Sequence, residues 1–209
     1  TFAEPVIGAI RRLVDASAIG VEFSKGEWGP GQHEINLRYA EALEMADRHV
    51  LYKTAAKEIA AQQGHSLTFM AKWNAAMAGS SLHVHMSLWN DRDQPVFAPA
   101  GEAAPLFHHF IGGLLAHAHE LSWLFAPTVN SYKRYREGTF APTRIAWSVD
   151  NRTAGFRVVG EGPSLRVECR IPGADANPYL TYAGLLAAGL DGIERQLDPE
   201  VDVVLSAHT

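Results

Sequence analysis

Two segments of the chain alternate polar and apolar residues, and their polar positions carry side chains that bind metals and phosphates. The segments are Leu82–Trp89 and Leu165–Ile171. Alternate residues of a strand share a side, and a sheet backed by helices turns its apolar side to the helices. The polar positions are His83, His85, Ser87, Arg166, Glu168 and Arg170. Alternation alone leaves an ordinary solvated face as the other interpretation.

Two further carboxylates, Glu27 and Glu34, flank the glycine-rich segment Gly29–Gln32. Carboxylates joined by a tight turn can converge on Mg²⁺ or Mn²⁺, which prefer oxygen ligands. Ordinary surface charge is the alternative for such a pair. Zinc is not indicated, because no third His or Cys follows the His-x-His pair at zinc-like spacing. The single cysteine, Cys169, excludes a disulfide framework, and its place in the alternation predicts burial in the core.

Arginines are concentrated between Lys133 and Arg170, although the chain has 18 Lys and Arg against 23 Asp and Glu and a net charge of −5. Guanidinium groups suit phosphate and carboxylate oxygens. Nucleic acid is not expected as a partner, because no recognition helix or aromatic RNA-binding pattern accompanies the arginines. Arginines, metal-type carboxylates and histidines together predict phosphoryl transfer from a nucleotide.

Hydrophobic periodicity, caps and turn residues predict the elements that must hold these side chains. Helices are expected over Pro5–Ser17, Ala40–Gln63 with Gly64 ending it, Ala104–Phe125, and from Asn177 to about Leu197. Strands are expected over Ile19–Phe23, Glu34–Tyr39, Leu67–Phe69, Leu82–Trp89, Arg144–Val149, Gly155–Val159 and Leu165–Ile171. Long helices with clustered strands predict an α+β fold with an antiparallel sheet backed by helices. Because no linker is visible, one domain over residues 1–209 is expected.

The composition excludes a disordered chain, because 47% of the residues are hydrophobic and 20% are charged. No secretory signal is recognised. No membrane partner is expected either, because the most apolar stretch, Ala104–Phe125, contains four histidines and Glu120. These features favour a cytoplasmic location.

Six segments, in this order, carry a resemblance to a known family. They are Gly29–Glu34, Gly79–Ser87, Asn130–Arg134, Asn151–Arg152, Arg166–Pro172 and Asp175–Leu180. The chain from about Val21 to Glu194 closely resembles the catalytic domain of glutamine synthetases. Within that family it is most similar to the glutamine-synthetase-like γ-glutamyl-amine ligases. A collinear series is far more specific than any one of its motifs.

The resemblance implies an enzyme that uses ATP and two divalent cations, Mg²⁺ or Mn²⁺. Such an enzyme phosphorylates the γ-carboxylate of glutamate, and ammonia or an organic amine then attacks the acyl phosphate. By resemblance, Glu27 and Glu34 bind one cation, and His83 and Glu168 bind the other. The ATP contacts would be His85, Ser87, Arg157 and Arg166, with Glu22 and Tyr39 lining the nucleotide pocket. Glutamate would be held by Gly79, His83, Arg134 and Arg170, and Arg152 would stabilise the transferring phosphoryl group.

The first departure from the family is that two of its usual parts are not seen in this sequence. Members have a small N-terminal β-grasp domain and a Glu-x-Glu strand that adds one ligand to each cation, and neither is visible in this sequence. The chain is therefore expected to be a fragment that is inactive alone, from a parent that forms a homo-oligomer. A catalytically inactive protein of assembly or regulation is one alternative, and a phosphotransferase to guanidino compounds is another. The retained Glu27, Glu34, His83, Glu168 and Arg170 argue against the inactive alternative.

A second departure lies in the flap, the loop that covers the amine site in this family. It usually reads Gly-Tyr-Glu-Ala-Pro, and here it reads Gly138-Thr139-Phe140-Ala141-Pro142. Phenylalanine cannot accept a proton from ammonium, whereas an apolar ring suits the carbon chain of an organic amine. We therefore interpret Phe140 as part of the substrate site and expect an organic amine as the acceptor, unless another residue replaces the missing glutamate.

Overall fold

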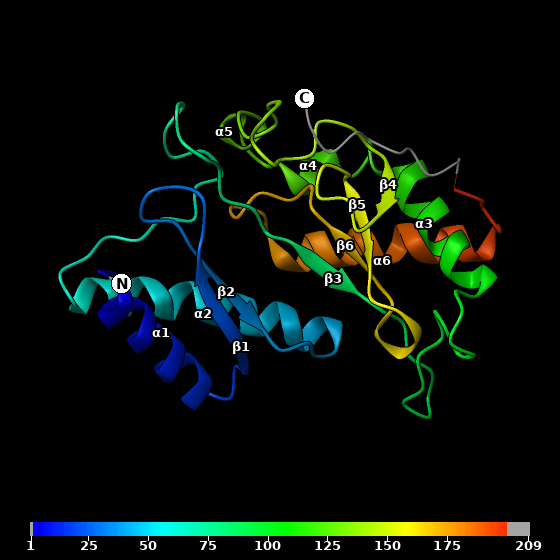
Figure 1. Ribbon diagram of the computed structural model, residues 1–209, viewed down its shortest axis with the longest axis horizontal. Coiled ribbons are helices and arrows are strands. Elements are labelled where there is room, and N and C mark those ends of the chain that lie inside the picture. Colours follow the sequence, from blue (N-terminus) through cyan, green and yellow to red (C-terminus); the bar gives the residue numbers. More distant parts are fainter. Residues whose placement is uncertain (1, 200–209) are drawn as a thin grey trace. The chain divides into compact units, whose positions relative to one another are not determined.

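The computed structural model describes residues 2–199, which form two compact units. The first unit comprises residues 2–69 and 73–78, and the second comprises residues 70–72 and 79–199. The expectation of a single domain stays a prediction. Helices and strands occur in both units, so the α+β class is confirmed (Figure 1). None of the helices in residues 2–199 combines the length and the apolar character that a membrane crossing requires.

The first unit packs two helices and a hairpin around a small core. Its elements are α1 (Glu4–Ala16), β1 (Val21–Gly26), β2 (His33–Leu37) and α2 (Ala42–Gln62). Ile10 and Val14 of α1 are buried in one cluster with Ile59 of α2. Gly64 has a φ of +73°, so it ends α2 in the left-handed conformation that glycine adopts readily, as predicted.

The strands β1 and β2 pair antiparallel, with Lys25 opposite Glu34 and a bulge near Val21. The predicted alternation of β2 is not reflected in its burial, because all five of its residues are half-buried. The predicted strand over Leu67–Phe69 is wrong. Among the described residues it pairs with no strand, and its apolar side chains instead pack against the helical core, where the Phe69 ring lies 5.8 Å from that of Tyr52.

The second unit contains a four-stranded sheet in the order β3-β6-β5-β4. Its elements are β3 (Val84–Met86), α3 (Pro105–His117), α4 (Ser122–Phe125), α5 (Val129–Tyr132), β4 (Trp147–Val149), β5 (Phe156–Val159), η1 (Gly162–Ser164), β6 (Arg166–Cys169) and α6 (Pro178–Glu194). β6 pairs antiparallel with both neighbours, but β4 runs parallel to β5. The sheet is therefore mixed and not wholly antiparallel. The chain between β4 and β5 returns to the start of β4 before β5 begins, so the two strands run in the same direction. Asp150 N donates to Val158 O at 2.9 Å at the end of this parallel pair.

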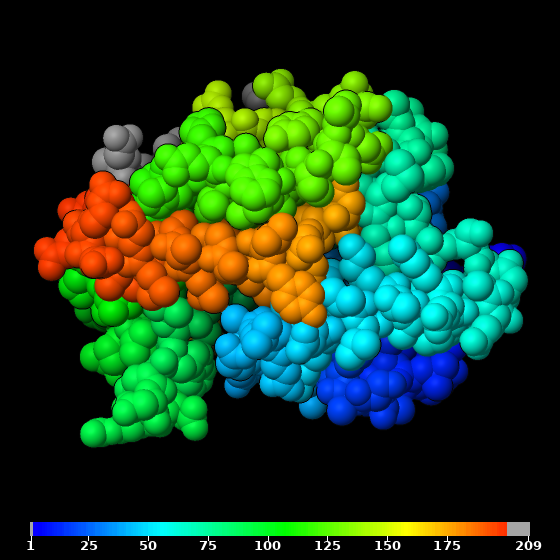
Figure 2. All heavy atoms as spheres, turned by 180° about the vertical axis from the view of Figure 1, so that it is seen from behind, coloured from blue at the N-terminus to red at the C-terminus, as the bar shows by residue number. Residues whose placement is uncertain are grey.

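The helices α3 and α6 pack side by side and share the core with the apolar face of this sheet (Figures 1 and 2). Figure 2 shows α6, in orange to red, beside the green band of α3 and α4. The two helix backbones approach closely at Gly113, where a Cβ atom would lie 2.0 Å from the carbonyl oxygen of Ala188. A larger residue at this position would force the helices apart.

The predicted helix Ala104–Phe125 is wrong in part, because α3 ends at His117 and α4 starts at Ser122. The hydrogen bonds from Ser122 N to His119 O and from Leu124 N to Leu121 O span three residues, so the chain turns more tightly here than an α-helix does. α6 begins as predicted. The Asn177 side chain caps it by accepting from Tyr179 N at 3.0 Å, and Pro178 follows.

Candidate active site

The polar faces of β3, β5 and β6 gather around one carboxylate, that of Glu168. In the sheet, His85 of β3 and Arg157 of β5 stand on either side of Glu168 in β6. Glu168 Oε1 accepts from Arg170 Nη1 at 2.6 Å and lies 3.3 Å from His83 Nδ1. Glu168 Oε2 accepts from Arg157 Nη1 at 3.0 Å. The register of three strands thus brings together a carboxylate, two imidazoles and two guanidinium groups.

This face is less exposed than an ordinary solvated face. Glu168 is only 3% exposed and Arg170 only 5%. A buried charge is strongly destabilising unless it is paired, and here Glu168 and Arg170 pair with each other. Cys169, on the other side of the strand, is fully buried, and burial raises the pKa of its thiol to about 12. It is therefore a core residue, as predicted, and not a nucleophile.

His85 is surrounded mainly by positive charge. Desolvation lowers the pKa of its imidazole, Glu168 opposes this, and three arginines (Arg166, Arg157 and Arg170) lower it further. Arg166 Nε lies 3.2 Å from His85 Nδ1. A neutral imidazole can accept this hydrogen bond and still offer its other nitrogen to a ligand.

Arg152 and Arg134 are held by the backbone of the same region. Arg170 Nε donates to the carbonyl oxygen of Arg152 at 3.0 Å, which fixes the loop that carries Arg152. The Arg134 side chain is buried, donates to the carbonyl oxygen of Ile171, and lies over the Tyr135 ring at 5.0 Å. Its Nε has no hydrogen-bond partner among the described protein atoms. Burial lowers the pKa of this guanidinium, so an anionic ligand beside it would be favoured.

Gly79 is placed against Arg134. A Cβ atom at Gly79 would lie 2.6 Å from Arg134 Cγ and 2.7 Å from the Ala71 carbonyl oxygen. Only glycine fits this contact, so Gly79 and Arg134 pack directly against each other, and their role in binding glutamate stays a prediction. Ser87 lies just beyond β3, where its hydroxyl accepts from Trp89 Nε1 at 2.9 Å, away from the bonds of Glu168.

Three further candidate residues are Glu22, Tyr39 and Phe140. Glu22 and Tyr39 are exposed residues of the first unit. Phe140 lies in the loop between α5 and β4, is 60% exposed, and has a φ of +58°. Aromatic residues seldom adopt this left-handed conformation, which is typical of turns and functional sites.

The first unit holds the other carboxylate pair. Lys25 Nζ lies 3.0 Å from Glu27 Oε1 and 3.4 Å from Glu34 Oε2. The two carboxylates therefore share one ammonium group, and their binding of a divalent cation stays a prediction. No cluster of three or more His, Cys, Asp or Glu suited to a metal occurs in residues 2–199. The chain offers donor pairs instead, Glu27 with Glu34 and His83 with Glu168, and carboxylate and imidazole groups are suitable ligands for Mg²⁺ or Mn²⁺.

Sequence reasoning missed two aspartates. Asp150 accepts from Arg157 Nε at 3.1 Å and holds this guanidinium against Glu168. Asp175 accepts from Ser131 Oγ at 2.7 Å and so ties the start of α6 to the α5 turn that precedes Arg134. Their signal in the sequence was their place inside the motifs, Asp150 directly before Asn151-Arg152 and Asp175 at the head of Asp-Ala-Asn-Pro.

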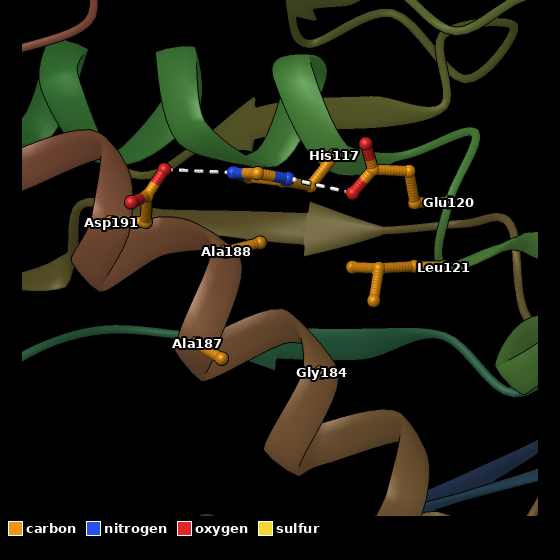
Figure 3. Close-up of a pocket in the computed structure, with 7 residues that line it drawn as sticks. All are labelled: His117, Glu120, Leu121, Gly184, Ala187, Ala188 and Asp191. Atoms are coloured by element: carbon orange, nitrogen blue, oxygen red, sulfur yellow. Dashed lines mark hydrogen bonds and ion pairs between the residues drawn. The ribbon is translucent and has the colours of Figure 1, made fainter. Parts of the chain in front are cut away.

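A pocket of about 270 Å³ lies on the helical side of the second unit (Figure 3). Its lining residues come from the C-terminal end of α3, the turn after it and α6: His117, Glu120, Leu121, Gly184, Ala187, Ala188 and Asp191. His117 lies between Asp191 and Glu120, as Figure 3 shows. None of the residues around Glu168 lines this pocket.

Comparison with known proteins settles the family. The family model described as "Glutamine synthetase, catalytic domain" matches residues 2–207. The chain belongs to the glutamine synthetase catalytic-domain family. Its resemblance to this family is thereby confirmed over nearly the whole sequence.

Two relatives of this glutamine synthetase-family chain are named for organic amines. A γ-glutamylethanolamide synthetase of Streptomyces coelicolor is 52% identical over 195 residues, which cover 93% of this chain and 42% of the relative. A glutamate–isopropylamine ligase of a Pseudomonas species is 42% identical over 207 residues, which cover 97% of this chain and 45% of the relative.

Solved structures agree with the fold of the family. GmaS without ligand matches with a TM-score of 0.90 at 38% identity, covering 97% of this chain and 47% of that chain. GmaS in complex with ADP matches with a TM-score of 0.88 at 37% identity. The chain thus spans somewhat less than half the length of the relatives it matches.

Proposed function

We propose that this chain is part of an ATP-dependent ligase that joins the γ-carboxylate of glutamate to an organic amine through an acyl phosphate. The Glu168 cluster carries the proposal, because it combines a buried carboxylate with two imidazoles and two guanidinium groups on, or directly beside, three neighbouring strands. The structural match to an ADP complex and the two amine-named relatives support it.

The chemistry requires two anions to meet, a carboxylate and a phosphate. In this proposal Glu27 with Glu34, and His83 with Glu168, hold divalent cations that would supply positive charge to offset the repulsion. Four residues, His85, Ser87, Arg157 and Arg166, bind the nucleotide phosphates, with Glu22 and Tyr39 at the nucleotide pocket.

Three arginines act on the other reactant. Arg134 and Arg170, with Gly79 and His83, hold the glutamate and orient its γ-carboxylate toward the phosphate. Arg152, whose carbonyl oxygen is fixed by Arg170, would stabilise the charge on the transferring phosphoryl group. The parent protein is proposed to act as a homo-oligomer, as the family resemblance implies.

Phe140 supports an organic amine over ammonium. A phenyl ring provides apolar contact area and has no charge or proton acceptor for NH₄⁺. The Phe140 side chain is 60% exposed in the described unit. We therefore propose a small aliphatic amine or amino alcohol as the acceptor.

The test is a ligation assay of the full-length protein with glutamate, Mg²⁺-ATP and a panel of ammonium, ethanolamine and isopropylamine, with γ-glutamyl products measured by mass spectrometry. We expect an organic amine to give a kcat/KM at least about tenfold above that of ammonium. Phe140→Glu should move this ratio toward ammonium by about tenfold. The matched control, Trp123→Glu, changes another exposed aromatic residue and should leave the ratio unchanged.

Two results would count against the proposal. If ammonium gives the highest kcat/KM in the unmodified protein, the organic-amine assignment is wrong. If the full-length protein shows no Mg²⁺-dependent nucleotide binding, the ligase assignment itself fails and a catalytically inactive role in assembly or regulation takes its place.

A further inference from the structure

The hairpin of β1 and β2 directs three charged side chains toward one another. Lys25 and Glu34 are opposite each other in the register, and Glu27 follows two residues after Lys25. The turn between the strands is held by hydrogen bonds from Glu27 N to Gln32 O and from Gln32 N to Gly29 O, both 2.9 Å. This turn fixes the two carboxylates on the same end of the hairpin.

The ammonium group of Lys25 is shared by the two carboxylates. It lies 3.0 Å from Glu27 Oε1 and 3.4 Å from Glu34 Oε2, and its side chain is 51% exposed. The second oxygen of Glu34 accepts from Asn36 Nδ2 at 2.5 Å, which orients the carboxylate. Two carboxylates this close repel each other unless a positive charge lies between them.

We propose that Lys25 is the resident cation of this carboxylate pair and competes with the divalent metal for it. The inference rests on the proposed function, which assigns Glu27 and Glu34 to a metal. Glu27 and Glu34 would hold a metal ion through the carboxylates that now face the Lys25 ammonium, so the ammonium and the metal would compete for one place. The metal therefore displaces the Lys25 amino group when it binds.

The net charge of Lys25, Glu27 and Glu34 sets how strongly the lysine weakens metal binding. With Lys25 in place the three side chains carry a net charge of −1, and without it they carry −2. Each exposed or half-exposed ion pair contributes little, but two such pairs must be broken to admit the metal. Removal of the lysine charge should therefore tighten metal binding at this pair roughly threefold to tenfold.

The experiment is a titration of the full-length protein with Mn²⁺ in the absence of nucleotide, with free Mn²⁺ followed by electron paramagnetic resonance. Lys25→Met should tighten one class of Mn²⁺ site roughly threefold to tenfold and leave the other class unchanged. Lys25→Arg keeps the charge and should bind like the unmodified protein.

The matched control is Lys57→Met, which removes the same charge from α2, where the amino group lies 5.8 Å from the centre of the Phe69 ring. It should leave both classes of site unchanged. Circular dichroism would verify that each variant folds. Lys25 is exposed on a hairpin, so methionine at this position should not disturb the core.

The Glu27→Gln variant separates the two levels of the proposal. If Glu27→Gln weakens one class of Mn²⁺ site but Lys25→Met does not tighten it, the role of Lys25 is wrong and the metal assignment stands. If neither Glu27→Gln nor Glu34→Gln changes Mn²⁺ binding, the metal assignment fails and the inference fails with it. Equal tightening by Lys57→Met would also overturn it, because the effect would then be one of net charge alone.

Discussion

Glu168 has more charged partners than any other described side chain around the candidate site, and all of them pair with its two carboxylate oxygens. Arg170 and His83 face Oε1, and Arg157 bonds to Oε2. Such a buried network is strongly stabilising only while every charge remains paired. The same carboxylate is proposed to bind a metal, so it links the stability of the sheet to the chemistry of the site.

We expect Glu168→Gln to lower the free energy of unfolding by about 2 to 4 kcal/mol, because it leaves the buried Arg170 guanidinium without its counter-charge. Urea unfolding followed by circular dichroism measures the change. The matched substitution, Arg166→Gln on the same strand, removes a more exposed charge and should lower it by less than about 1 kcal/mol. Equal effects of the two substitutions would show that the Glu168 network does not stabilise the unit.

At the scale of elements, the end of α3 is joined to α6 by one histidine. His117 Nε2 lies 2.7 Å from Asp191 Oδ2, and His117 Nδ1 lies 3.1 Å from Glu120 Oε2 (Figure 3). A neutral imidazole has a single N–H group, so both bonds can be donated only by the charged form. These two hydrogen bonds raise the pKa of His117, and the C-terminal end of a helix also favours a positive charge.

The stability of this contact should therefore depend on pH. Because the pKa of His117 is raised on folding, its contribution is fully present below the unfolded pKa of about 6.5 and is lost as the pH rises through the folded value. The groups that face it are Glu120, Asp191 and Arg195, which lies 3.0 Å from Asp191. The hydrogen bond from His117 lowers the pKa of Asp191 further below its usual value, so this carboxylate stays charged between pH 6 and 8.5.

We expect His117→Gln to lower the free energy of unfolding by about 0.5 to 1 kcal/mol at pH 6 and by less at pH 8.5. Urea unfolding at both pH values measures the difference. The control is His119→Gln, which changes an exposed histidine in the same turn and should change the free energy of unfolding by less than about 0.5 kcal/mol at pH 6. If His117→Gln changed the free energy of unfolding equally at pH 6 and pH 8.5, the charge of His117 would not stabilise the contact between α3 and α6.

The elements that could be predicted were those whose signals are local. Gly64 ends α2 and Asn177 starts α6, and each acts through its own backbone or side chain. The expected strand over Leu67–Phe69 failed because a strand requires a partner, which a single segment cannot reveal. The long helix through Phe125 failed because its apolar pattern continues across a tightened turn.

In the candidate site, too, only the features with a local signal in the sequence could be predicted. Alternation predicted that His85 and Glu168 share a face, because the side-chain period of a strand is local. It did not predict that Glu168 would be buried or that Asp150 would hold Arg157, because both depend on neighbouring strands. Whether the Glu27 pair lies near the Glu168 cluster stays a prediction of the family resemblance.

At the scale of the whole molecule, the chain corresponds to less than half of each relative, and this limits which properties can be assigned to it. The chain spans 42% and 45% of two curated relatives, so activity is a property we assign to the longer protein. Within the described residues the candidate metal ligands occur as two pairs, one in each unit. Mg²⁺ favours six ligands in near-octahedral geometry, so each pair leaves most positions to water, to substrate or to other protein groups.

We therefore expect the 209 residues, expressed alone, to form no γ-glutamyl amide with Mg²⁺-ATP, glutamate and the amine that serves the full-length protein best. Two protein ligands hold each cation weakly, and a weakly held cation is poorly positioned to offset the repulsion between carboxylate and phosphate. Product formation measured by mass spectrometry at equal molar concentration tests this, with circular dichroism as the control that the shorter chain folds. Amide formation by the folded 209-residue chain within about tenfold of the full-length rate would show that its own residues complete both cation sites.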